Sequence, residues 1–326
     1  MPDSLNIPNI DLQRTLNGEV LCEGIGLHSG LKIKMKIIPA EPNKGITFLR
    51  DDVLDKQQIF ASYRNVSDTK LGTTIVNKAG YKIRTIEHLM AAFMGLKIDN
   101  ALVILSGDEV PIMDGSSKVF MDLINEIGMK EQFVKRKVIK ILREVAVYHG
   151  KSSIIAGPSD DFTIEYKIDF QDPAIGIQEQ KLTLLGSNFD KEISTARTFA
   201  MLNEVQYMRK NGLALGGSID NAIVVDNGKI LNPGGLRFKD EFVRHKILDL
   251  CGDIYLSGKN FIGTISAVCA GHEINNKFLW ELFSDNNNYQ EIESNRISST
   301  EELLLQWHKD NNEFKKIILS KIYNNF

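Results

Sequence analysis

Three polar residues stand at regular intervals in an otherwise apolar stretch of the sequence. His245, Asp249 and Asp253 are each four residues apart in RHKILDLCGD. On a helix this spacing puts them one above another on a single face. Side chains four residues apart have Cβ atoms about 5 to 6 Å apart, so His245 and Asp249 could bind one cation together. Taken by themselves, the two residues also fit the commoner arrangement, a core histidine hydrogen-bonded to an acid.

A second predicted helix offers matching groups. Glu87 and His88 are adjacent in its first turn, in TIEHLMAAF. If this helix faces the first one, His88 would be a third ligand beside His245 and Asp249, and a fourth position would stay open. A metal site of that kind binds water and lowers its pKa to about 7. Glu87 could then act as the general base. The simpler alternative for Glu87 is an acid that complements the helix dipole.

The remaining histidines are weighed by their surroundings. His272 begins GHEINNKF, but Asn276 stands where the HExxH metalloprotease motif requires histidine. Asp253 could accept the His272 N–H and keep the ring protonated as a general acid, although a helix-capping histidine fits as well. His149 lies in a predicted hairpin turn and His308 in a polar C-terminal helix. Both are expected at the solvated surface.

The first half of the chain is predicted to supply a small sheet and two helices. Strands are expected between Gly18 and Leu49, separated by glycine turns. The helix of Glu87 should be capped by Thr85 and closed by Gly95. A buried strand, NALVIL, follows, and then a helix capped by Ser116 or Ser117 that ends near Ile127.

The second half repeats this order. A meander of strands starts near Lys135, and its segment IIAGPSDDFTIEYK faintly echoes IIPAEPNKGITFLR. A helix over about 240–257, a strand over 261–270 and a helix from His272 then match residues 84–127. We therefore predict an α+β fold of two related domains, residues 1–134 and 135–326. Only the second contains an insert, at about 186–237, a common place for specificity.

Composition excludes several classes of protein. The 326 residues are 43% hydrophobic with a net charge of −3, which gives no electrostatic reason to expect nucleic acid. Three widely spaced cysteines, Cys22, Cys251 and Cys269, suggest neither a disulfide framework nor a thiolate zinc site. No signal peptide and no run of about 18 apolar residues is present, so a cytoplasmic protein without a transmembrane segment is expected. GIGLHSG and GLALGGS fail the dinucleotide and phosphate-loop patterns.

Nine segments, in order from about Leu16 to Phe283, resemble the UDP-3-O-acyl-N-acetylglucosamine deacetylase family, zinc amidases of lipid A synthesis in Gram-negative bacteria. They are GIGLHSG, TIEHLMAAF, IDN, PIMDGS, IDFQDPAI, ARTF, GLALGGSIDNAIVVD, LRFKDEFVRHKILDLCGD and GHEINNK. The resemblance implies two domains, each a small sheet packed on two helices, with the helices facing each other around the metal. It also implies that the polar groups on the apolar helix hold a cation at this interface.

Catalytic roles follow from the resemblance. It implies that His88, His245 and Asp249 bind one Zn²⁺, with Glu87 as general base and His272 as general acid. The remaining catalytic groups are Asp253, which would orient His272, Thr198, which would hydrogen-bond the oxyanion, and Lys246, which would approach the substrate phosphate or the oxyanion. The implied reaction is the attack of activated water on the 2-acetamido carbonyl, giving acetate and UDP-3-O-acyl-glucosamine.

Substrate contacts are implied in the same way. Asp169 and Phe170 match uridine contacts, and His28 and Lys151 are further candidates for contact with the UDP-sugar. Residues of the insert would contact the substrate and line a tunnel for its 3-O-acyl chain: Phe199, Leu202, Val205, Met208, Ala214, Gly217 and Ile219.

Some features lie outside the resemblance. The family carries a basic residue three positions before His272, where this chain has Cys269. The tail from about 284 to 326 matches no family segment, and STEELLLQWHKDNNEFKKIILSKIY is predicted to form an amphipathic helix. The sequence leaves open the acyl length, the oligomeric state (a monomer is compatible) and the protein partners. It also leaves open the native metal, because the ligand set suits iron(II) as well as zinc.

Two other functions are weighed against the deacetylase. One is a zinc amidase that shares the site but acts on a different acylated amine, which the apolar insert and the pair Asp169 and Phe170 disfavour. The other is a non-catalytic nucleotide-sugar binder that holds no metal. Glu87 and His272 lie beside three potential metal ligands, and this combination disfavours a non-catalytic binder. A metal with only a structural role would need neither a general base nor a general acid.

Overall fold

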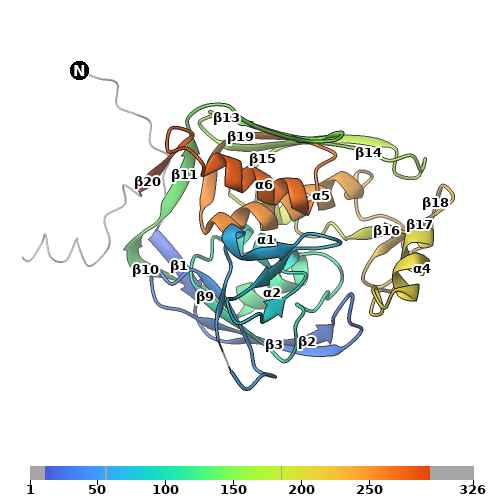
Figure 1. Ribbon diagram of the computed structural model, residues 1–326, viewed down its shortest axis with the longest axis horizontal. Helices are drawn as coiled ribbons and strands as arrows, with labels where there is room; N and C mark the ends of the chain where they lie inside the picture. Colours follow the sequence, from blue (N-terminus) through green and yellow to red (C-terminus); the bar gives the residue numbers. More distant parts are fainter. Residues whose placement is uncertain (1–11, 56, 185, 294–326) are drawn as a thin grey trace, which may run out of the picture.

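The computed structural model describes residues 12–55, 57–184 and 186–293. Figure 1 shows its layers: one sheet on each outer side and four main helices packed between the two sheets. These helices are α1 (Glu87–Leu96), α2 (Lys118–Ile127), α5 (Glu241–Ile254) and α6 (His272–Leu282). None of the helices in the described ranges is long and apolar enough to cross a membrane.

The first sheet alternates buried and exposed residues because one face lies on the helices and the other faces solvent. In its second strand Ile33, Met35 and Ile37 are buried while Lys32 and Lys34 are exposed. The strands lie in the order β2 (Val20–Ile25), β3 (Lys32–Pro39), β9 (Ala101–Leu105), β4 (Ile46–Arg50) and β5 (Ile59–Phe60). Strand β9 is antiparallel to β3 and parallel to β4.

The second sheet repeats this arrangement. Its strands run β12 (Val145–His149), β13 (Ser152–Gly157), β19 (Asn260–Val268), β14 (Phe162–Asp169) and β15 (Ile177–Thr183), with β19 antiparallel to β13 and parallel to β14. The echoing segments fall on corresponding strands, β3 and β4 against β13 and β14. The predicted α+β class is therefore confirmed. In both sheets the predicted meander is interrupted by a later strand. Strand β9, which follows α1 in the chain, pairs between β3 and β4, and β19, which follows α5, pairs between β13 and β14. The domain boundary at residues 134 and 135 stays a prediction.

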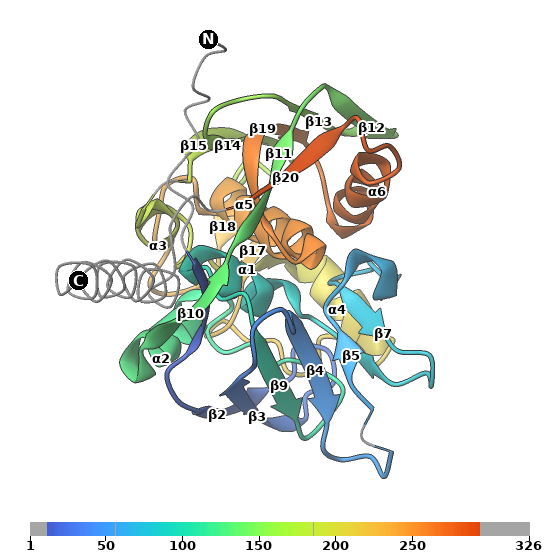
Figure 2. The same ribbon diagram turned by 90° about the vertical axis from the view of Figure 1, so that its left-hand side faces the viewer.

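A ribbon along one side joins the two sheets. Figure 2 shows β10 (Met129–Lys135) and β11 (Lys137–Ile141) as a nearly continuous path from the first layer to the second. Strand β10 pairs with β1 (Leu12–Leu16), and β11 pairs with β19 and with β20 (Tyr289–Glu293). The start of the predicted tail is thus a strand of the second sheet. The predicted amphipathic helix and His308 lie outside the described residues.

Two smaller sheets flank the layers at the ends of the central helices. One lies between β5 and α1 in the chain, and the other belongs to the predicted insert. The first small sheet follows η1 (Tyr63–Asn65) and consists of β6 (Val66–Asp68), β7 (Thr74–Val76) and β8 (Lys82–Ile83). The sheet of the insert consists of β16 (Phe199–Met201), β17 (Ile223–Asp226) and β18 (Lys229–Ile230). The insert also contains the helices α3 (Asn188–Glu192) and α4 (Leu202–Lys210).

Helices α1 and α5 cross at very short range. A Cβ on Gly252, in the last turn of α5, would lie 2.0 Å from the backbone oxygen of Glu87, so only glycine allows this approach. Below the crossing, the Tyr255 hydroxyl in η2 (Tyr255–Ser257) donates to the Ile98 carbonyl at 2.8 Å. Nearly all of α5 is buried, and His245 and Asp249 on this helix face His88 of α1.

Two predicted helix ends are wrong. Thr85 is not the N-cap of α1: its φ is +56° and its hydroxyl donates to Glu109 at 3.2 Å, while the helix begins at Glu87 with no side-chain cap. The helix also ends one residue beyond Gly95, at Leu96, with Lys97 in the left-handed conformation. Gly95 instead leaves room for the ring of Phe189, which would lie 2.3 Å from a Cβ there.

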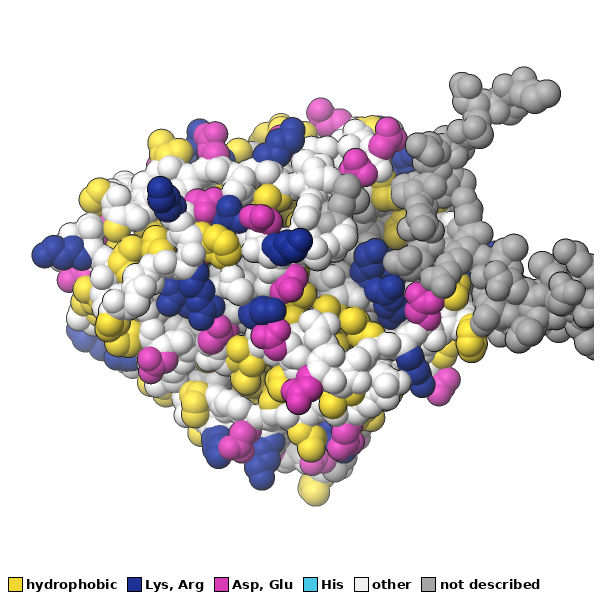
Figure 3. Space-filling model, turned by 180° about the vertical axis from the view of Figure 1, so that it is seen from behind, with side chains coloured by type: hydrophobic (Ala, Val, Ile, Leu, Met, Phe, Trp, Pro, Cys, Tyr) yellow, Lys and Arg dark blue, Asp and Glu magenta, His cyan; other side chains and the backbone are white. Residues whose placement is uncertain are grey.

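The surface carries mixed charge. Figure 3 shows Lys and Arg interspersed with Asp and Glu over the face behind that of Figure 1, with hydrophobic side chains between them. Exposed ion pairs on the surface of the protein include Lys32 with Glu23 and Lys36 with Glu19. Exposed pairs of this kind contribute little to stability.

Candidate active site

A buried cluster of two histidines and one acid lies where α1 and α5 meet. Each of His88, His245 and Asp249 offers a ligand atom, and these atoms lie within 4.8 Å of one another. Asp249 Oδ1 is 3.6 Å from His88 Nε2 and 3.3 Å from His245 Nε2. Ligand atoms at zinc distances around a tetrahedral ion are roughly 3.3 Å apart. The cluster therefore fits a divalent cation, and the structure brings together the three residues that the sequence singles out.

The surroundings of the cluster prepare it for a cation. Burial lowers the pKa of His245 to about 3, so this ring is neutral. Its Nδ1 lies 3.1 Å from the Ala196 carbonyl oxygen, which leaves the Nε2 lone pair facing the cluster. Burial raises the pKa of the Asp249 carboxyl, but His245 and Lys246 outweigh it and lower this pKa well below its usual value. Lys246 Nζ donates to Asp249 Oδ2 at 2.6 Å. The Nδ1 of His88 has no hydrogen-bond partner among the described residues.

Glu87 lies beside the cluster at the start of α1. Its side chain is 3% exposed, and burial raises the pKa of its carboxyl. One oxygen, Oε2, accepts a hydrogen bond from the backbone N–H of Thr73 at 2.9 Å. The other faces Gly72, where a Cβ would lie 3.0 Å from Oε1. A carboxylate with a raised pKa, oriented by a backbone donor, suits a general base.

His272 and Asp253 form a hydrogen-bonded pair on the other side. His272 Nδ1 lies 2.7 Å from Asp253 Oδ2. Burial lowers the pKa of His272, but the charge of Asp253 and this hydrogen bond outweigh it and raise the pKa to about 9. The ring is therefore protonated at neutral pH, as a general acid must be. The alternative role in helix capping does not apply, because the N-cap of α6 is Gly271 and no side chain caps it.

A cavity of about 530 Å³ runs from this cluster into the insert. Thr198, Lys246 and His272 line it together with His245 and Asp249. Its other walls come mainly from β16, α4 and the loop that follows α4, and they are mostly apolar. The substrate residues named from the sequence that line it are His28, Phe170, Phe199, Leu202, Val205, Met208, Ala214, Gly217 and Ile219.

Two other residues named from the sequence lie outside this cavity. Asp169 ends β14 and Lys151 lies in the turn after β12, and both are exposed. His28 is 7% exposed, and its Nε2 lies 3.2 Å from the Leu71 carbonyl oxygen. The structure thus brings His28 to the cavity wall but not Asp169 or Lys151.

Sequence reasoning missed part of the lining. Ala200 and Met201 directly follow ARTF, and Glu204 and Arg209 lie on α4 among predicted residues, so adjacency was the available signal. Leu27 is likewise next to His28, and Ser218 lies between Gly217 and Ile219. Leu71 and Leu231 come from segments in which no site residue was named, so they gave no local signal. The lining residues that were not named are Leu27, Leu71, Ala200, Met201, Glu204, Arg209, Ser218, Ala222, Val224, Leu231 and Ala270.

The ARTF and PIMDGS motifs have a structural explanation. The backbone N–H of Thr198 donates to the Gly115 carbonyl at 2.8 Å. A Cβ on Gly115 would lie 2.1 Å from the Asn221 carbonyl oxygen, so glycine is required there. Arg197 Nε donates to Glu241 Oε1 at 2.9 Å and ties the segment to the first turn of α5. These contacts fix Thr198 at the wall of the cavity.

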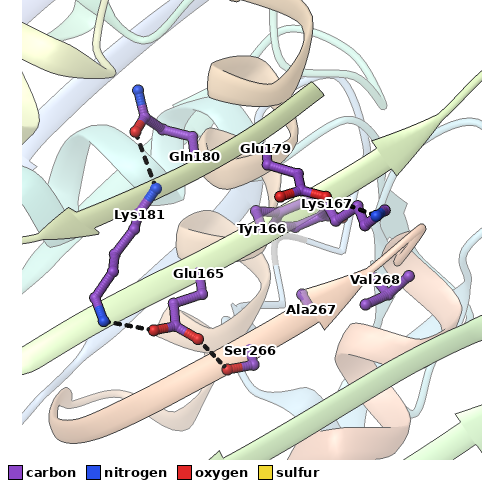
Figure 4. Close-up of a pocket in the computed structure, with 9 residues that line it drawn as sticks. All are labelled: Glu165, Tyr166, Lys167, Glu179, Gln180, Lys181, Ser266, Ala267 and Val268. Atoms are coloured by element: carbon purple, nitrogen blue, oxygen red, sulfur yellow. Dashed lines mark hydrogen bonds and ion pairs between the residues drawn. The ribbon is translucent and has the colours of Figure 1, made fainter. Parts of the chain in front are cut away.

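A separate hollow lies on the outer face of the second sheet. Figure 4 shows it crossed by ion pairs and hydrogen bonds between neighbouring strands. Lys181 pairs with Glu165 at 2.7 Å, and Ser266 donates to the same carboxylate at 2.8 Å. Lys167 pairs with Glu179 at 2.6 Å. Its charged groups are thus engaged with one another, and none of its lining residues belongs to the cluster where α1 and α5 meet.

Comparison with known proteins gives a consistent result. Residues 13–284 match the family model described as UDP-3-O-acyl N-acetylglycosamine deacetylase. A protein of Sulfurimonas denitrificans is 45% identical over 281 residues, which cover 86% of this chain and 95% of the relative. A protein of Saccharophagus degradans is 44% identical over 282 residues, covering 86% and 93%. Both relatives are named UDP-3-O-acyl-N-acetylglucosamine deacetylase.

Proposed function

The chain belongs to the UDP-3-O-acyl N-acetylglycosamine deacetylase family, and on that premise we propose that it removes the acetyl group of UDP-3-O-[(R)-3-hydroxyacyl]-N-acetylglucosamine. The products are acetate and UDP-3-O-acyl-glucosamine, in the committed step of lipid A biosynthesis. The observation that carries the proposal is the meeting of a His, His, Asp cluster with Glu87 and with the His272–Asp253 pair at the end of an apolar cavity.

His88, His245 and Asp249 would hold a single Zn²⁺. A divalent ion bound there supplies Lewis-acid chemistry, polarising the amide carbonyl and acidifying water. The contacts of 3.3 and 3.6 Å between ligand atoms support this assignment. Iron(II) accepts the same donors and is the other candidate for the native ion.

Glu87, Thr198 and His272 would perform the chemical steps. Water adds to the 2-acetamido carbonyl carbon while Glu87 accepts its proton, and the carbonyl oxygen becomes an oxyanion. The Thr198 hydroxyl donates a hydrogen bond to this oxygen, and Lys246 also lines the cavity. His272 then donates its proton to the leaving nitrogen as the C–N bond breaks. Asp253 holds His272 in the orientation that this transfer requires.

The rest of the substrate would extend from this centre in two directions. The 3-O-acyl chain enters the apolar cavity between β16 and α4, whose lining includes Leu202, Val205 and Met208. The uridine lies against Phe170 and Asp169 at the end of β14. His28 and Lys151 are further proposed contacts of the UDP-sugar.

The partner of the protein would be this small-molecule substrate, and we place the enzyme in the cytoplasm. Three free cysteines, Cys22, Cys251 and Cys269, support a reducing compartment.

The proposal is tested by measuring acetate release from the UDP-sugar by the purified protein, before chelation, after chelation and after Zn²⁺ is restored. Release that disappears and returns is expected. Metal-loaded, folded protein that releases no acetate from this substrate would contradict the proposal. Release from an unrelated N-acetyl sugar alone would assign the site to a different acylated amine.

A further inference from the structure

Thr73 is a buried polar residue whose position no step above explains. It lies just before β7 in the small flanking sheet and is 2% exposed. It is not among the residues that line the cavity. Its backbone N–H, hydroxyl and carbonyl nevertheless all make hydrogen bonds, and each leads to the beginning of α1 or to α5.

These three bonds connect groups that are far apart in the sequence. The Thr73 N–H donates to Glu87 Oε2 at 2.9 Å, and its hydroxyl donates to Asp253 Oδ1 in a short hydrogen bond. Its carbonyl accepts from the Ile86 N–H at 3.3 Å. One residue therefore contacts both the proposed general base and the carboxylate that orients the proposed general acid, although Thr73 and Asp253 are 180 residues apart.

Thr73 is the donor that holds Oδ1 of the Asp253 carboxylate, and two other residues hold Oδ2. Its Oδ2 accepts from His272 Nδ1 at 2.7 Å and from Asn275 Nδ2 at 2.8 Å, while its Oδ1 is held by Thr73. Without the hydroxyl, the carboxylate could turn about its last side-chain bond and carry the imidazole with it. Partners that orient a functional group in this way commonly affect activity about 10- to 100-fold when removed.

The local backbone delivers Thr73 to this place. Leu71 has a φ of +60° and Gly72 a φ of +152°, so two unusual residues turn the chain immediately before it. The Leu71 carbonyl accepts from His28 Nε2 at 3.2 Å if that nitrogen carries the proton, which helps to hold the turn. A β-branched side chain then has few rotamers, so the direction of the hydroxyl is largely fixed by the backbone.

We propose that Thr73 is a positioning residue of the deacetylation reaction, which sets the general base Glu87 and the Asp253–His272 pair relative to each other across the two repeats. The proposal rests on the proposed function for its kinetic consequence. Its structural consequence, the orientation of His272, can be measured without substrate.

The test compares Thr73→Val, which removes the hydroxyl while keeping the shape, with Thr73→Ser, which keeps the hydroxyl. For Thr73→Val we expect kcat to fall about 10- to 100-fold, with KM and metal content near the wild-type values. Thr73→Ser should stay within about threefold of wild type, because both donors remain. Thr15→Val is the control: it removes another buried hydroxyl, which donates to the Asn100 carbonyl at 2.7 Å, accepts from the Ala40 N–H at 3.1 Å and does not line the cavity.

A second readout does not depend on turnover. In protein with ¹⁵N-labelled histidine, the Nδ1–H proton of His272 should give a low-field signal, assigned by its loss in His272→Gln. This signal should persist in Thr73→Ser and Thr15→Val and shift or broaden in Thr73→Val. Wild-type kcat and an unchanged signal in Thr73→Val would overturn the proposal, as would equal losses in the Ser and Val variants. If the wild type releases no acetate, the proposed function fails, and the signal alone decides the positioning role.

Discussion

At the scale of single residues, the site is a set of buried charges that satisfy one another. His88, His245, Asp249 and Glu87 are all less than 5% exposed, and isolated charges at that depth would be costly. Lys246 compensates Asp249 from one side, and the proposed cation would do so from the other. Asp253 gains three donors in place of water. Each role can therefore be tested by removing one group.

Two carboxylates near each other should respond differently to truncation. Glu87→Ala should retain the metal and lose most turnover, because a general base commonly contributes about 10²- to 10⁴-fold. Asp249→Ala should lose metal affinity, because it removes a ligand atom. Metal content by atomic spectroscopy and kcat for acetate release distinguish the two. Wild-type turnover in Glu87→Ala, or full metal occupancy in Asp249→Ala, would refute the respective role.

The pair of His272 and Asp253 predicts a pH dependence. Burial lowers the pKa of His272, but Asp253, with Glu87 and Asp249, outweighs it and raises the pKa to about 9. The general acid therefore keeps its proton as pH rises through neutrality and loses it only at alkaline pH. Asp253→Asn removes the charge, so the alkaline fall in kcat should move to lower pH by about 1 to 3 units. The measurement is the pH profile of kcat for both proteins. If kcat fell at the same alkaline pH in both proteins, His272 would not be the general acid.

At the scale of elements, two close contacts determine where the chemistry lies. The crossing of α1 and α5 at Gly252 places His88 opposite His245 and Asp249. The insert then builds one wall of the cavity, because β16 leads from Thr198 into α4. A change at the helix crossing should therefore affect metal binding, whereas a change in the insert should affect binding of the acyl chain.

Gly252→Ala should weaken metal binding and lower stability. The new methyl would lie 2.0 Å from the Glu87 carbonyl oxygen, so the two helices must separate, and overpacking of this kind costs about 1 to 3 kcal/mol. Gly157→Ala is the matched control, because a Cβ there meets nothing within 4 Å. Thermal unfolding and zinc affinity measure both effects. A Gly252→Ala protein that binds zinc as tightly as the control would show that the crossing tolerates a methyl.

Val205→Trp should shorten the acyl cavity. Val205 lines it from α4, so a larger side chain should raise KM for substrates with long acyl chains while short ones are affected less. Tyr207→Trp, on the same helix at an exposed position, serves as the control. The measurement is KM across a series of acyl lengths. An equal change for every length would argue that the chain binds elsewhere.

At the scale of the whole molecule, the fold is one α+β unit used twice. Both sheets share a strand order, and their helices meet in the middle (Figure 1). The proposed metal would join a helix of each unit, so it would act as a link between them as well as a catalyst. A ligand that binds only the folded state adds stability in proportion to the logarithm of its concentration over Kd.

Chelation should therefore lower the unfolding temperature. At free zinc 100 times above Kd, binding adds about 2.7 kcal/mol of stability, which chelation removes. Asp249→Ala is the control, because a protein that has lost the site should show little response to the chelator. Differential scanning calorimetry with and without chelator gives both values. An unfolding temperature that is equally insensitive in the wild type would contradict a metal between the two units.

Much of this was predictable because the information is local. The spacing of His245, Asp249 and Asp253 places them on one face of any helix, and most helix and strand positions follow from apolar periodicity. The wrong cap at Thr85 shows the limit, because its hydroxyl is taken by Glu109, 24 residues away in the sequence. Asp169 and Lys151 show another limit, since a motif does not reveal whether a side chain reaches a cavity.

The sequence by itself thus determined the residue types, their helical spacing and the resemblance to a zinc amidase family, because short-range geometry and motif order suffice for these. Only the tertiary structure decided that His88 meets residues more than 150 positions away, that Gly252 permits this meeting, and that Thr73 contacts both Glu87 and Asp253. These contacts depend on how two sheets and their helices pack, and packing between distant segments leaves no period in the sequence.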